Sequence, residues 1–413
     1  MSTRGRFRSV ATAGITFQAG SAAVDSATIM SALIFQLTGN PILVGAVTAI
    51  LRFGWLFPQI FVGFLAQRSG ASMRYYFIGA FGRAGWMAAL AAVLFFGAGL
   101  QTNLLAVLVM LIWTAYAFTS GIVAVPYTDI VARSVPSELR SRLLATRFFG
   151  GGLLALAVVA IADHVVGTLA FPLSYAAIIT VAAALMFLSS VVFSAMGEPQ
   201  AASDKASRST FFQYLRDGVT VFRTDLNFRK FVYAQWCGGA VLMAMPFYVV
   251  QADSVGVSLE NVALLLGAQT AGSLGSNVIW GWWGDRLGKV SLLRVVSIGR
   301  ILPPAAILIL APAQFFGPDQ MLFLFVGTFF VLGALANGLT IAVIGFLMEI
   351  SPDDRRPAYT GYFNAITAPS FLLPLLAGII ISMFGLSIIF MISLVAAILQ
   401  LFFLFRIATR EAR

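Results

Sequence analysis

The chain alternates between long apolar runs and short polar segments that hold most of its charges. A helix that crosses a bilayer needs roughly 20 apolar residues, and the apolar runs reach that length. They are too long, and too uniformly apolar, for the alternating strands of a membrane barrel. Because only helices and closed barrels satisfy their backbone inside hydrocarbon, we expect twelve transmembrane helices. The runs cover approximately residues 12–37, 41–66, 74–98, 103–132, 141–166, 171–195, 229–252, 259–284, 290–312, 320–349, 358–384 and 386–406.

The composition agrees with a membrane protein. Of the 413 residues, 60% are hydrophobic and 10% are charged, against about 25% charged residues in an average soluble domain. This composition excludes a soluble enzyme, a disordered chain and a disulfide scaffold. The single cysteine cannot form an internal disulfide, and the single histidine argues against a histidine-based metal site. We expect no enzymatic activity, no metal and no cofactor.

The positions of the cationic residues predict the orientation in the membrane. The net charge is +10, and 22 of the 26 Lys and Arg residues fall in segments on one side of the predicted topology. The positive-inside rule therefore predicts a multi-pass protein of the inner or plasma membrane with both termini in the cytoplasm. The partner of this positive charge is the lipid bilayer, and we expect no nucleic acid and a monomeric protein. The four remaining cations lie inside predicted spans: Arg52, Arg83, Arg147 and Arg300.

The longest polar segment divides the chain into two halves. It predicts a six-helix bundle over residues 1–196, a cytoplasmic linker over 197–228 and a second six-helix bundle over 229–413. Thr210 and Gln213 in the linker have the spacing of a capping box. We expect an amphipathic helix on the membrane surface, and a flexible tether is the alternative. The apolar face of this helix would hold Phe211, Leu215, Val219 and Phe222.

Short sequences recur in the two halves, in the same order and at nearly constant spacing. GFLAQRSG at 63–70 corresponds to GWWGDRLGK at 281–289, and Gly82-Arg83 corresponds to Gly299-Arg300. PSELR at 136–140 likewise corresponds to PDDRR at 352–356. Two parallel repeats predict an all-α membrane protein whose two six-helix bundles are related by pseudo-two-fold symmetry, with a cavity between them.

The twelve spans, the repeat and the GWWGDRLGK loop together resemble the major facilitator superfamily of secondary transporters. The family pattern in this loop is roughly G-x-x-x-D-(R/K)-x-G-(R/K). The first copy departs from it at Gln67, which stands where the family has Asp. The second copy matches at Gly281, Asp285, Arg286, Gly288 and Lys289, and the first copy matches at Gly63, Arg68 and Gly70.

The resemblance implies that this loop holds one end state closed, with Asp285 as the gating carboxylate of the second half. Arg286 and Lys289 are expected at the level of the lipid headgroups. Gln67 cannot carry a charge, so the first-half contact must be weaker or different. Asp129, near the end of the fourth span, could supply the missing carboxylate. The alternative is that Asp129 only pairs locally with Arg133 or Arg140.

Ionisable residues inside a membrane span normally face protein or water and have a role. Asp25 and Arg52 lie near the middle of the first two spans, where Asp25 could exchange a proton for coupling. A permanent ion pair between them is the alternative. Arg52 and Arg147 carry planar forks suited to an anion, or they join helices. For Arg83 and Arg300 the repeat favours a shared structural role over substrate contact.

The second half offers neutral polar groups within its spans instead of charges. Such amides either join helices or line a cavity. We consider four of them candidates for substrate contact: Gln235, Gln269, Asn337 and Asn364.

These observations predict a secondary transporter that moves a small organic solute by alternating access. The excess of arginine favours an anionic solute, and Asp25 favours proton coupling. An exporter of lipophilic cations is an alternative, although the FFGGG sequence at 148–152 lacks the G-P-x-x-G-G run of the drug:proton antiporters. A transporter-like receptor or assembly protein that no longer transports is a third interpretation, which Gln67 favours.

Overall fold

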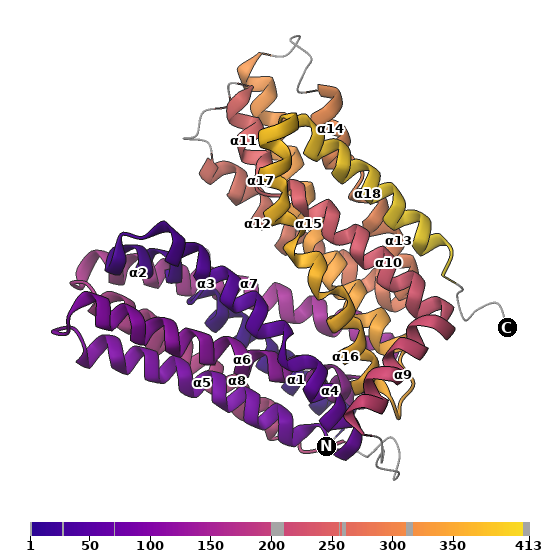
Figure 1. Ribbon diagram of the computed structural model, residues 1–413, viewed down its shortest axis with the longest axis horizontal. Coiled ribbons are helices and arrows are strands. Elements are labelled where there is room, and N and C mark those ends of the chain that lie inside the picture. The colour runs from indigo at the N-terminus through magenta and orange to yellow at the C-terminus, as the bar shows by residue number, and fades with distance from the viewer. Residues whose placement is uncertain are drawn as a thin grey trace. The chain divides into compact units, whose positions relative to one another are not determined.

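We analysed a computed structural model of the chain. It describes residues 2–26, 29–69, 71–199, 210–255, 257, 262–310 and 317–407, and these residues form helices and connecting turns without any strand. Figure 1 shows the helices in chain order. Eight stretches of this described part are long and apolar enough to cross a membrane. The all-helical architecture predicted from the apolar runs is therefore confirmed.

The helices follow the predicted spans closely. The first half contains α1 (Thr3–Ala22), α2 (Ile29–Thr38), α3 (Pro41–Leu56), α4 (Pro58–Ser69), α5 (Met73–Phe96), α6 (Thr102–Ser134), α7 (Ser137–Thr168) and α8 (Leu173–Ser194). After the linker helix α9 (Phe211–Thr224), the second half contains α10 (Leu226–Val241), α11 (Phe247–Ser254), α12 (Val262–Arg286), α13 (Lys289–Gly299), α14 (Leu302–Leu310), α15 (Pro318–Ile350), α16 (Arg356–Thr367), α17 (Leu373–Phe384) and α18 (Ser387–Phe405).

Several predicted spans consist of two helices rather than one. The seventh span breaks at a 3₁₀ turn, Leu242–Ala244, which is followed by Pro246, and the eleventh breaks at a 3₁₀ turn, Ala368–Leu372, which contains Pro369. Proline removes a backbone donor and clashes with the preceding turn, so it ends a helix. The first span breaks between α1 and α2 without a proline, and Asp25 lies in this break.

The contacts divide the chain into two compact units. Unit 1 comprises residues 1–136, 146–214 and 351–365, and unit 2 comprises residues 137–145, 215–350 and 366–413. These units differ from the two sequence halves in two places. The first turns of α7 pack with second-half helices in unit 2, and most of α16 packs with first-half helices in unit 1.

The core of unit 1 forms around α5, which packs against α6 and α8, while α1 packs against α8 and α3 against α6. Trp113 on α6 is fully buried, and its indole donates a hydrogen bond of 2.9 Å to the Val47 carbonyl on α3. Ser189 on α8 donates to the Ala13 carbonyl on α1 at 2.6 Å. Buried polar groups of unit 1 thus join neighbouring helices.

The most extensive packing in unit 2 joins α12 and α15. A Cβ atom at Gly272 would lie 2.0 Å from the Phe330 carbonyl oxygen, and one at Gly333 would lie 1.8 Å from the Gln269 carbonyl oxygen. The two backbones can approach this closely only because both positions are glycine. Across the same interface, Trp280 donates to the Ala334 carbonyl at 2.6 Å.

The linker helix α9 begins with the predicted capping box. The Thr210 amide donates to Gln213 Oε1 at 2.8 Å, and the Gln213 amide donates to Thr210 Oγ1 at 3.3 Å. Of the predicted apolar face, Val219 is 51% exposed, whereas Tyr214 and Val221 are buried against the protein. The side of α9 that packs against the protein therefore includes Tyr214, and the placement of the apolar face on the membrane surface stays a prediction.

Candidate functional site

Two arginine side chains of unit 1 face the same aromatic ring. The guanidinium carbon of Arg83, on α5, lies 3.8 Å from the centre of the Phe17 ring on α1. That of Arg147, on α7, lies 5.9 Å from the same ring and 5.1 Å from the ring of Tyr127 on α6. The Arg147 side chain packs against Gly14, which leaves room for it, because a Cβ atom at Gly14 would lie 2.4 Å from Arg147 Cγ. Four helices of unit 1 thus bring two permanent positive charges together.

Neither guanidinium has a hydrogen bond or an ion pair within the described part of the chain. Arg83 is only 4% exposed, and the Nε atoms of Arg83 and Arg147 and the hydroxyl of Tyr127 are buried without a partner. A desolvated cation–π contact stabilises by about 2 kcal/mol, whereas taking one charge out of water costs several kcal/mol. The ring of Phe17 therefore offsets only part of the cost, and an anion at this place would balance the remainder.

Arg300, the repeat counterpart of Arg83, has a different environment. It lies between α13 and α14 in unit 2 and is 6% exposed. Its Nη1 donates to Gln400 Oε1 on α18 at 2.7 Å, and its Nη2 donates to the Gly238 carbonyl on α10 at 3.0 Å. The structural role that the repeat suggests for both arginines is therefore visible at Arg300 but not at Arg83.

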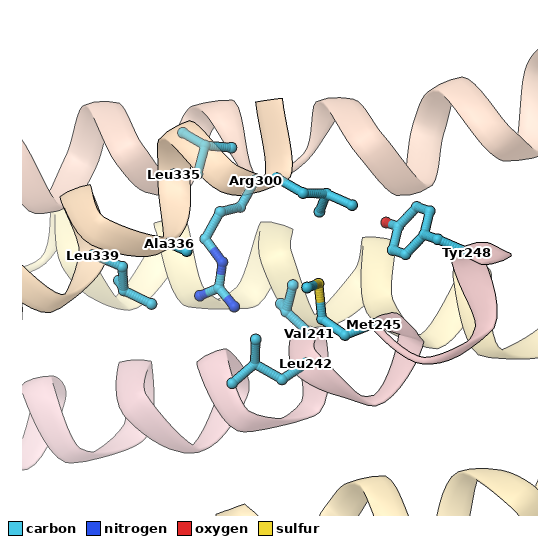
Figure 2. A pocket seen from close by; sticks show the side chains of 9 residues that line it. Val241, Leu242, Met245, Tyr248, Arg300, Leu335, Ala336 and Leu339 are labelled. Carbon is cyan, nitrogen blue, oxygen red and sulfur yellow. The ribbon is translucent and has the colours of Figure 1, made fainter. Parts of the chain in front are cut away.

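A small cavity of about 60 Å³ lies beside Arg300 (Figure 2). Pockets for small organic ligands are typically about 300–1,000 Å³, so this cavity has no room for such a solute. The residues that line the cavity are almost entirely apolar, and the Arg300 side chain lies among them. The lining residues are Val241, Leu242, Met245, Tyr248, Arg300, Leu332, Leu335, Ala336 and Leu339.

Two of the candidate amides connect helices. Asn337 on α15 donates to Ser273 Oγ on α12 at 2.8 Å. Asn364 on α16 donates through its amide to Gln59 Oε1 on α4 within unit 1. The sequence left two roles open for these side chains, joining helices or contacting substrate. In the structure, both side chains join helices. Gln235 on α10 and Gln269 on α12 are half-buried and belong to unit 2.

Asp25 and Arg52 both have exposed side chains in unit 1. Asp25 lies in the break that follows α1, and its carbonyl accepts a bond of 3.1 Å from the Met30 amide on α2. Arg52 lies on α3. A carboxylate at an interrupted helix can change its surroundings with less backbone rearrangement than one inside a continuous helix, which suits a proton-exchanging group.

The GWWGDRLGK loop holds the amino end of α7 within unit 2. Asp285 accepts hydrogen bonds from the backbone amides of Ser141 and Arg142, each at 2.8 Å. Lys289 is 4% exposed, contrary to the expected headgroup position, and its Nζ donates to the Ser137 carbonyl at 2.6 Å and to Asp285 at 3.2 Å. Asp285 therefore binds two backbone amides in the second turn of α7 and joins α12 to α7.

The glycines of this loop have separate roles. A Cβ atom at Gly281 would lie 2.7 Å from the Ala145 side chain, so Gly281 allows α7 to approach α12. Gly288 has a φ of 86° at the start of α13, a backbone conformation that favours glycine. Arg286 is exposed.

The first-half loop packs differently. A Cβ atom at Gly63 and one at Gly361 would each lie 2.6 Å from the hydroxyl oxygen of Tyr214. Within the described residues this hydroxyl is buried without a hydrogen-bond partner, and burial raises the pKa of Tyr214 well above its usual range. Arg68 is exposed, and Gly70 lies outside the described residues. The linker helix thus inserts an aromatic side chain between α4 and α16 in unit 1.

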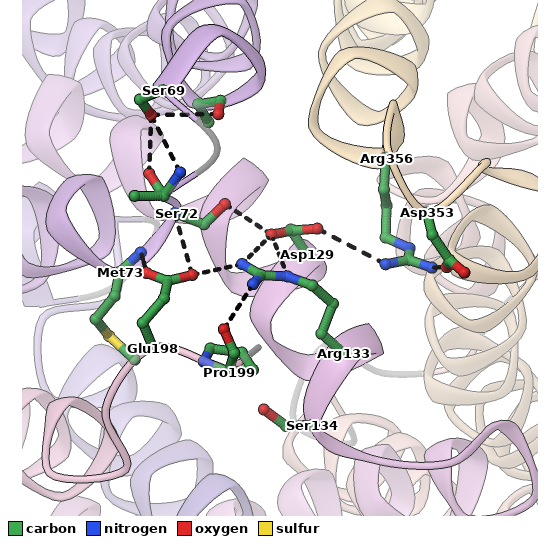
Figure 3. A network of polar contacts seen from close by, with 12 residues as sticks. Ser69, Ser72, Met73, Asp129, Arg133, Ser134, Glu198, Pro199, Asp353 and Arg356 are labelled. Carbon is green, nitrogen blue, oxygen red and sulfur yellow. Dashed lines mark hydrogen bonds and ion pairs between the residues drawn. The ribbon is translucent and has the colours of Figure 1, made fainter. Parts of the chain in front are cut away.

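Asp129 on α6 is the centre of a polar network in unit 1 (Figure 3). Its Oδ2 accepts from Ser72 Oγ at 2.7 Å and from Arg133 Nη2 at 2.5 Å, and its Oδ1 lies 3.7 Å from Arg356 Nη1 at the start of α16. Asp353 also pairs with Arg356. Asp129 therefore pairs locally with Arg133 and also approaches Arg356 at the start of α16, and its part in gating stays a prediction.

The sequence alone missed several residues of these sites, among them Glu198, Phe17, Tyr127 and Tyr214. Glu198 accepts from the Met73 amide at 2.6 Å and pairs with Arg133 at 2.6 Å, so it caps α5 within the Asp129 network. Phe17, Tyr127 and Tyr214 are aromatic residues, and no sequence motif marks their role. A carboxylate directly after the sixth span was the one signal available, at Glu198.

Comparisons with known proteins agree with this architecture. Residues 240–413 match the family model of the Major Facilitator Superfamily. No curated protein sequence matches the chain. A bacterial homologue of the iron transporter ferroportin, crystallised in the outward-facing state, is 15% identical with a TM-score of 0.78, over 98% of this chain and 100% of that chain.

Two proton symporters have similar structures. The fucose:proton symporter FucP of E. coli is 14% identical with a TM-score of 0.73, over 99% of this chain and 100% of that chain. The proton:xylose symporter XylE is 13% identical with a TM-score of 0.68, over 98% of this chain and 96% of that chain. At these identities the likeness shows the fold. Together with the match over residues 240–413, it shows that this multi-pass membrane protein has the fold of the Major Facilitator Superfamily transporters.

Proposed function

We propose that this protein is a secondary transporter that moves a small organic anion across the membrane, coupled to protons. One observation carries the proposal. The arginines Arg52, Arg83 and Arg147 lie within predicted spans of unit 1 without a hydrogen bond or an ion pair in the described part of the chain. Uncompensated positive charge inside a membrane protein normally marks a path for an anion.

Asp25 is the proposed proton site. It is the one acidic residue near the middle of the first span, and it lies at the helix break between α1 and α2. Proton uptake at Asp25 would remove a negative charge from a part of the molecule that also binds the anion. The two similar structures that are proton symporters, FucP and XylE, support coupling by analogy of fold alone.

Two sets of contacts are proposed to be released and remade in each transport cycle. The first joins Asp285 to the amino end of α7, and the second joins Asp129 to Arg356 at the start of α16. Both α7 and α16 contribute residues to each of the two units. Contacts at the ends of such shared helices are suited to control a conformational change.

The test is transport in proteoliposomes of purified protein. We expect a pH gradient to drive accumulation of at least one member of a panel of radiolabelled carboxylates, and a trapped pH dye to report proton movement with it. Asp25→Asn should transport without proton movement, while the matched variant Asp354→Asn, in an exposed loop, should behave as the wild type. Accumulation of lipophilic cations, with no carboxylate moved, would contradict the proposal.

A further inference from the structure

We infer that Arg83 and Arg147, together with the Tyr127 hydroxyl, form a binding site for the carboxylate of a flat organic anion inside unit 1. The site lies where α1, α5, α6 and α7 meet, around the ring of Phe17. This inference deepens the proposed function, because it says where the transported anion is held and what its charged group is.

The first argument is the set of open hydrogen-bond donors. Among the residues that the structure describes, the Nε atoms of both arginines and the Tyr127 hydroxyl are buried and have no hydrogen-bond partner. An arginine with its Nε free presents the edge formed by Nε and one Nη, which is one of its two-pronged faces toward a carboxylate. A carboxylate accepts about four hydrogen bonds. The two arginine edges supply four N–H donors, the number that a single carboxylate accepts, and the Tyr127 hydroxyl is one further donor beside them.

The second argument is the internal comparison with Arg300. This residue has the same place in the repeat, and protein acceptors satisfy it at 2.7 Å and 3.0 Å. The fold can therefore supply acceptors for an arginine at this position. It does not supply them to Arg83, which is equally buried. The carboxylate of a bound ligand would supply the acceptor that the described part of unit 1 does not supply to Arg83.

The third argument concerns the rest of the ligand. The guanidinium carbon of Arg147 lies 5.5 Å from the Phe148 ring, in addition to the rings of Phe17 and Tyr127. Aromatic side chains around a charged pair favour a flat, apolar group attached to the carboxylate over a fully hydrated ion. The site therefore suits an aromatic or similarly flat monocarboxylate.

Equilibrium dialysis of the purified protein in detergent tests the site, with radiolabelled benzoate as the probe and acetate and inorganic phosphate as competitors. We expect saturable benzoate binding that acetate and phosphate displace weakly. The variants Arg83→Gln and Arg147→Gln should each raise the Kd of benzoate at least about tenfold, which is the effect of one lost charge-assisted hydrogen bond. The control variant Arg223→Gln, an exposed cation on α9, should leave the Kd unchanged.

Thermal unfolding without ligand separates a binding role from a structural one. A cation without a protein partner leaves nothing unpaired when it is removed. Arg83→Gln should therefore keep or raise the Tm, whereas Arg300→Gln should lower it because Gln400 and Gly238 lose their donor. A lower Tm for Arg83→Gln, or benzoate binding that both Arg83→Gln and Arg147→Gln retain, would overturn the site. If Arg83→Gln does not fold, Tyr127→Phe provides the same test by removing one hydroxyl.

The remaining outcomes separate the two proposals. Absence of saturable benzoate binding to the wild type overturns the site, and so does a preference for inorganic phosphate. If benzoate binds as expected but no carboxylate is transported, the site stands and the proposed transport function falls. If carboxylates are transported and both arginine variants transport them with unchanged KM, the function stands and the site falls.

Discussion

A buried arginine can serve as a connector or as a receptor, and its hydrogen-bond partners distinguish the two. Arg300 connects three elements of unit 2, because its guanidinium reaches α18 through Gln400 and α10 through the Gly238 carbonyl. Removing the arginine would leave both acceptors buried. An unsatisfied buried group costs more than the hydrogen bond itself contributes. The packing of α10 and α18 around the break between α13 and α14 therefore depends on Arg300.

A double-mutant cycle measures this connection. We expect Arg300→Gln and Gln400→Leu each to destabilise the protein in equilibrium unfolding in mixed detergent. The coupling energy between them should be about 1.5–3 kcal/mol, the range for a hydrogen bond to a charged group. Additive effects, to within about 0.5 kcal/mol, would show that the bond at 2.7 Å contributes nothing specific.

Tyr214 predicts a pH dependence with a definite sign. Its hydroxyl is buried between Gly63 and Gly361, and burial raises its pKa in the folded protein, whereas an unfolded tyrosine titrates near pH 10. The stability that this shift contributes is complete below about pH 10 and is lost as the pH rises further. Tyr214→Phe also removes an unpartnered hydroxyl, so it should keep or raise the Tm at pH 7.

The measurement is the Tm of the wild type and of Tyr214→Phe from neutral to alkaline pH. The variant should lose less stability than the wild type above about pH 10. Parallel curves for the two proteins would mean that the Tyr214 hydroxyl ionises in the folded state as readily as in the unfolded one.

In unit 2, the close packing of α12 against α15 depends on the positions of the glycine residues and not on their number. On α15, a Cβ atom at Gly333 would lie 1.8 Å from a backbone oxygen of α12, whereas a Cβ atom at Gly327 has open space around it. A backbone atom cannot rotate away as a side chain can. The same substitution on one helix should therefore have opposite effects at these two positions.

We expect Gly333→Ala to destabilise the protein by about 1–3 kcal/mol or more, as overpacking does. Gly327→Ala should be neutral or stabilise by up to about 1 kcal/mol, since alanine favours the helix. Unfolding in mixed detergent measures both. Equal effects of the two substitutions would contradict the close approach of α12 and α15.

The contact of Asp285 with α7 can be followed by chemical labelling. Cys237 is the only cysteine, so Cys237→Ser gives a background in which Ala145→Cys, at a position 5% exposed beside Gly281, is a single reporter. Asp285→Asn weakens two charge-assisted bonds to the amides of Ser141 and Arg142. The maleimide labelling rate should then rise at least about tenfold. Asp354→Asn is the control, and an equal increase there would show that the effect is not specific to this contact.

For the molecule as a whole, the sequence predicted the positions of the membrane spans along the chain. It did not predict which helices, distant in the sequence, contact one another. The apolar runs marked α5, α6, α8 and α15 correctly, because hydrocarbon imposes length and polarity on each span separately. The ring of Phe17 between Arg83 and Arg147 could not be predicted, since neither periodicity nor repeat spacing says which helices face each other. At Asp129 the structure shows the local pair with Arg133, which the sequence offered, and a second cation, Arg356, which lies far away along the chain.

The orientation in the membrane is the remaining whole-molecule prediction. The segments between spans that carry cations alternate with segments that carry none, and 22 of 26 Lys and Arg residues lie on one side. Insertion retains such segments in the cytoplasm. A fluorescent protein fused after Arg413 should therefore fluoresce, and alkaline phosphatase inserted at Gly99, in the turn between α5 and α6, should be active. Phosphatase fused after Arg413 should be inactive. Activity there would reverse the orientation and place the Asp129 and Asp285 contacts on the outer side, where the membrane potential and the proton gradient would act on them with the opposite sign.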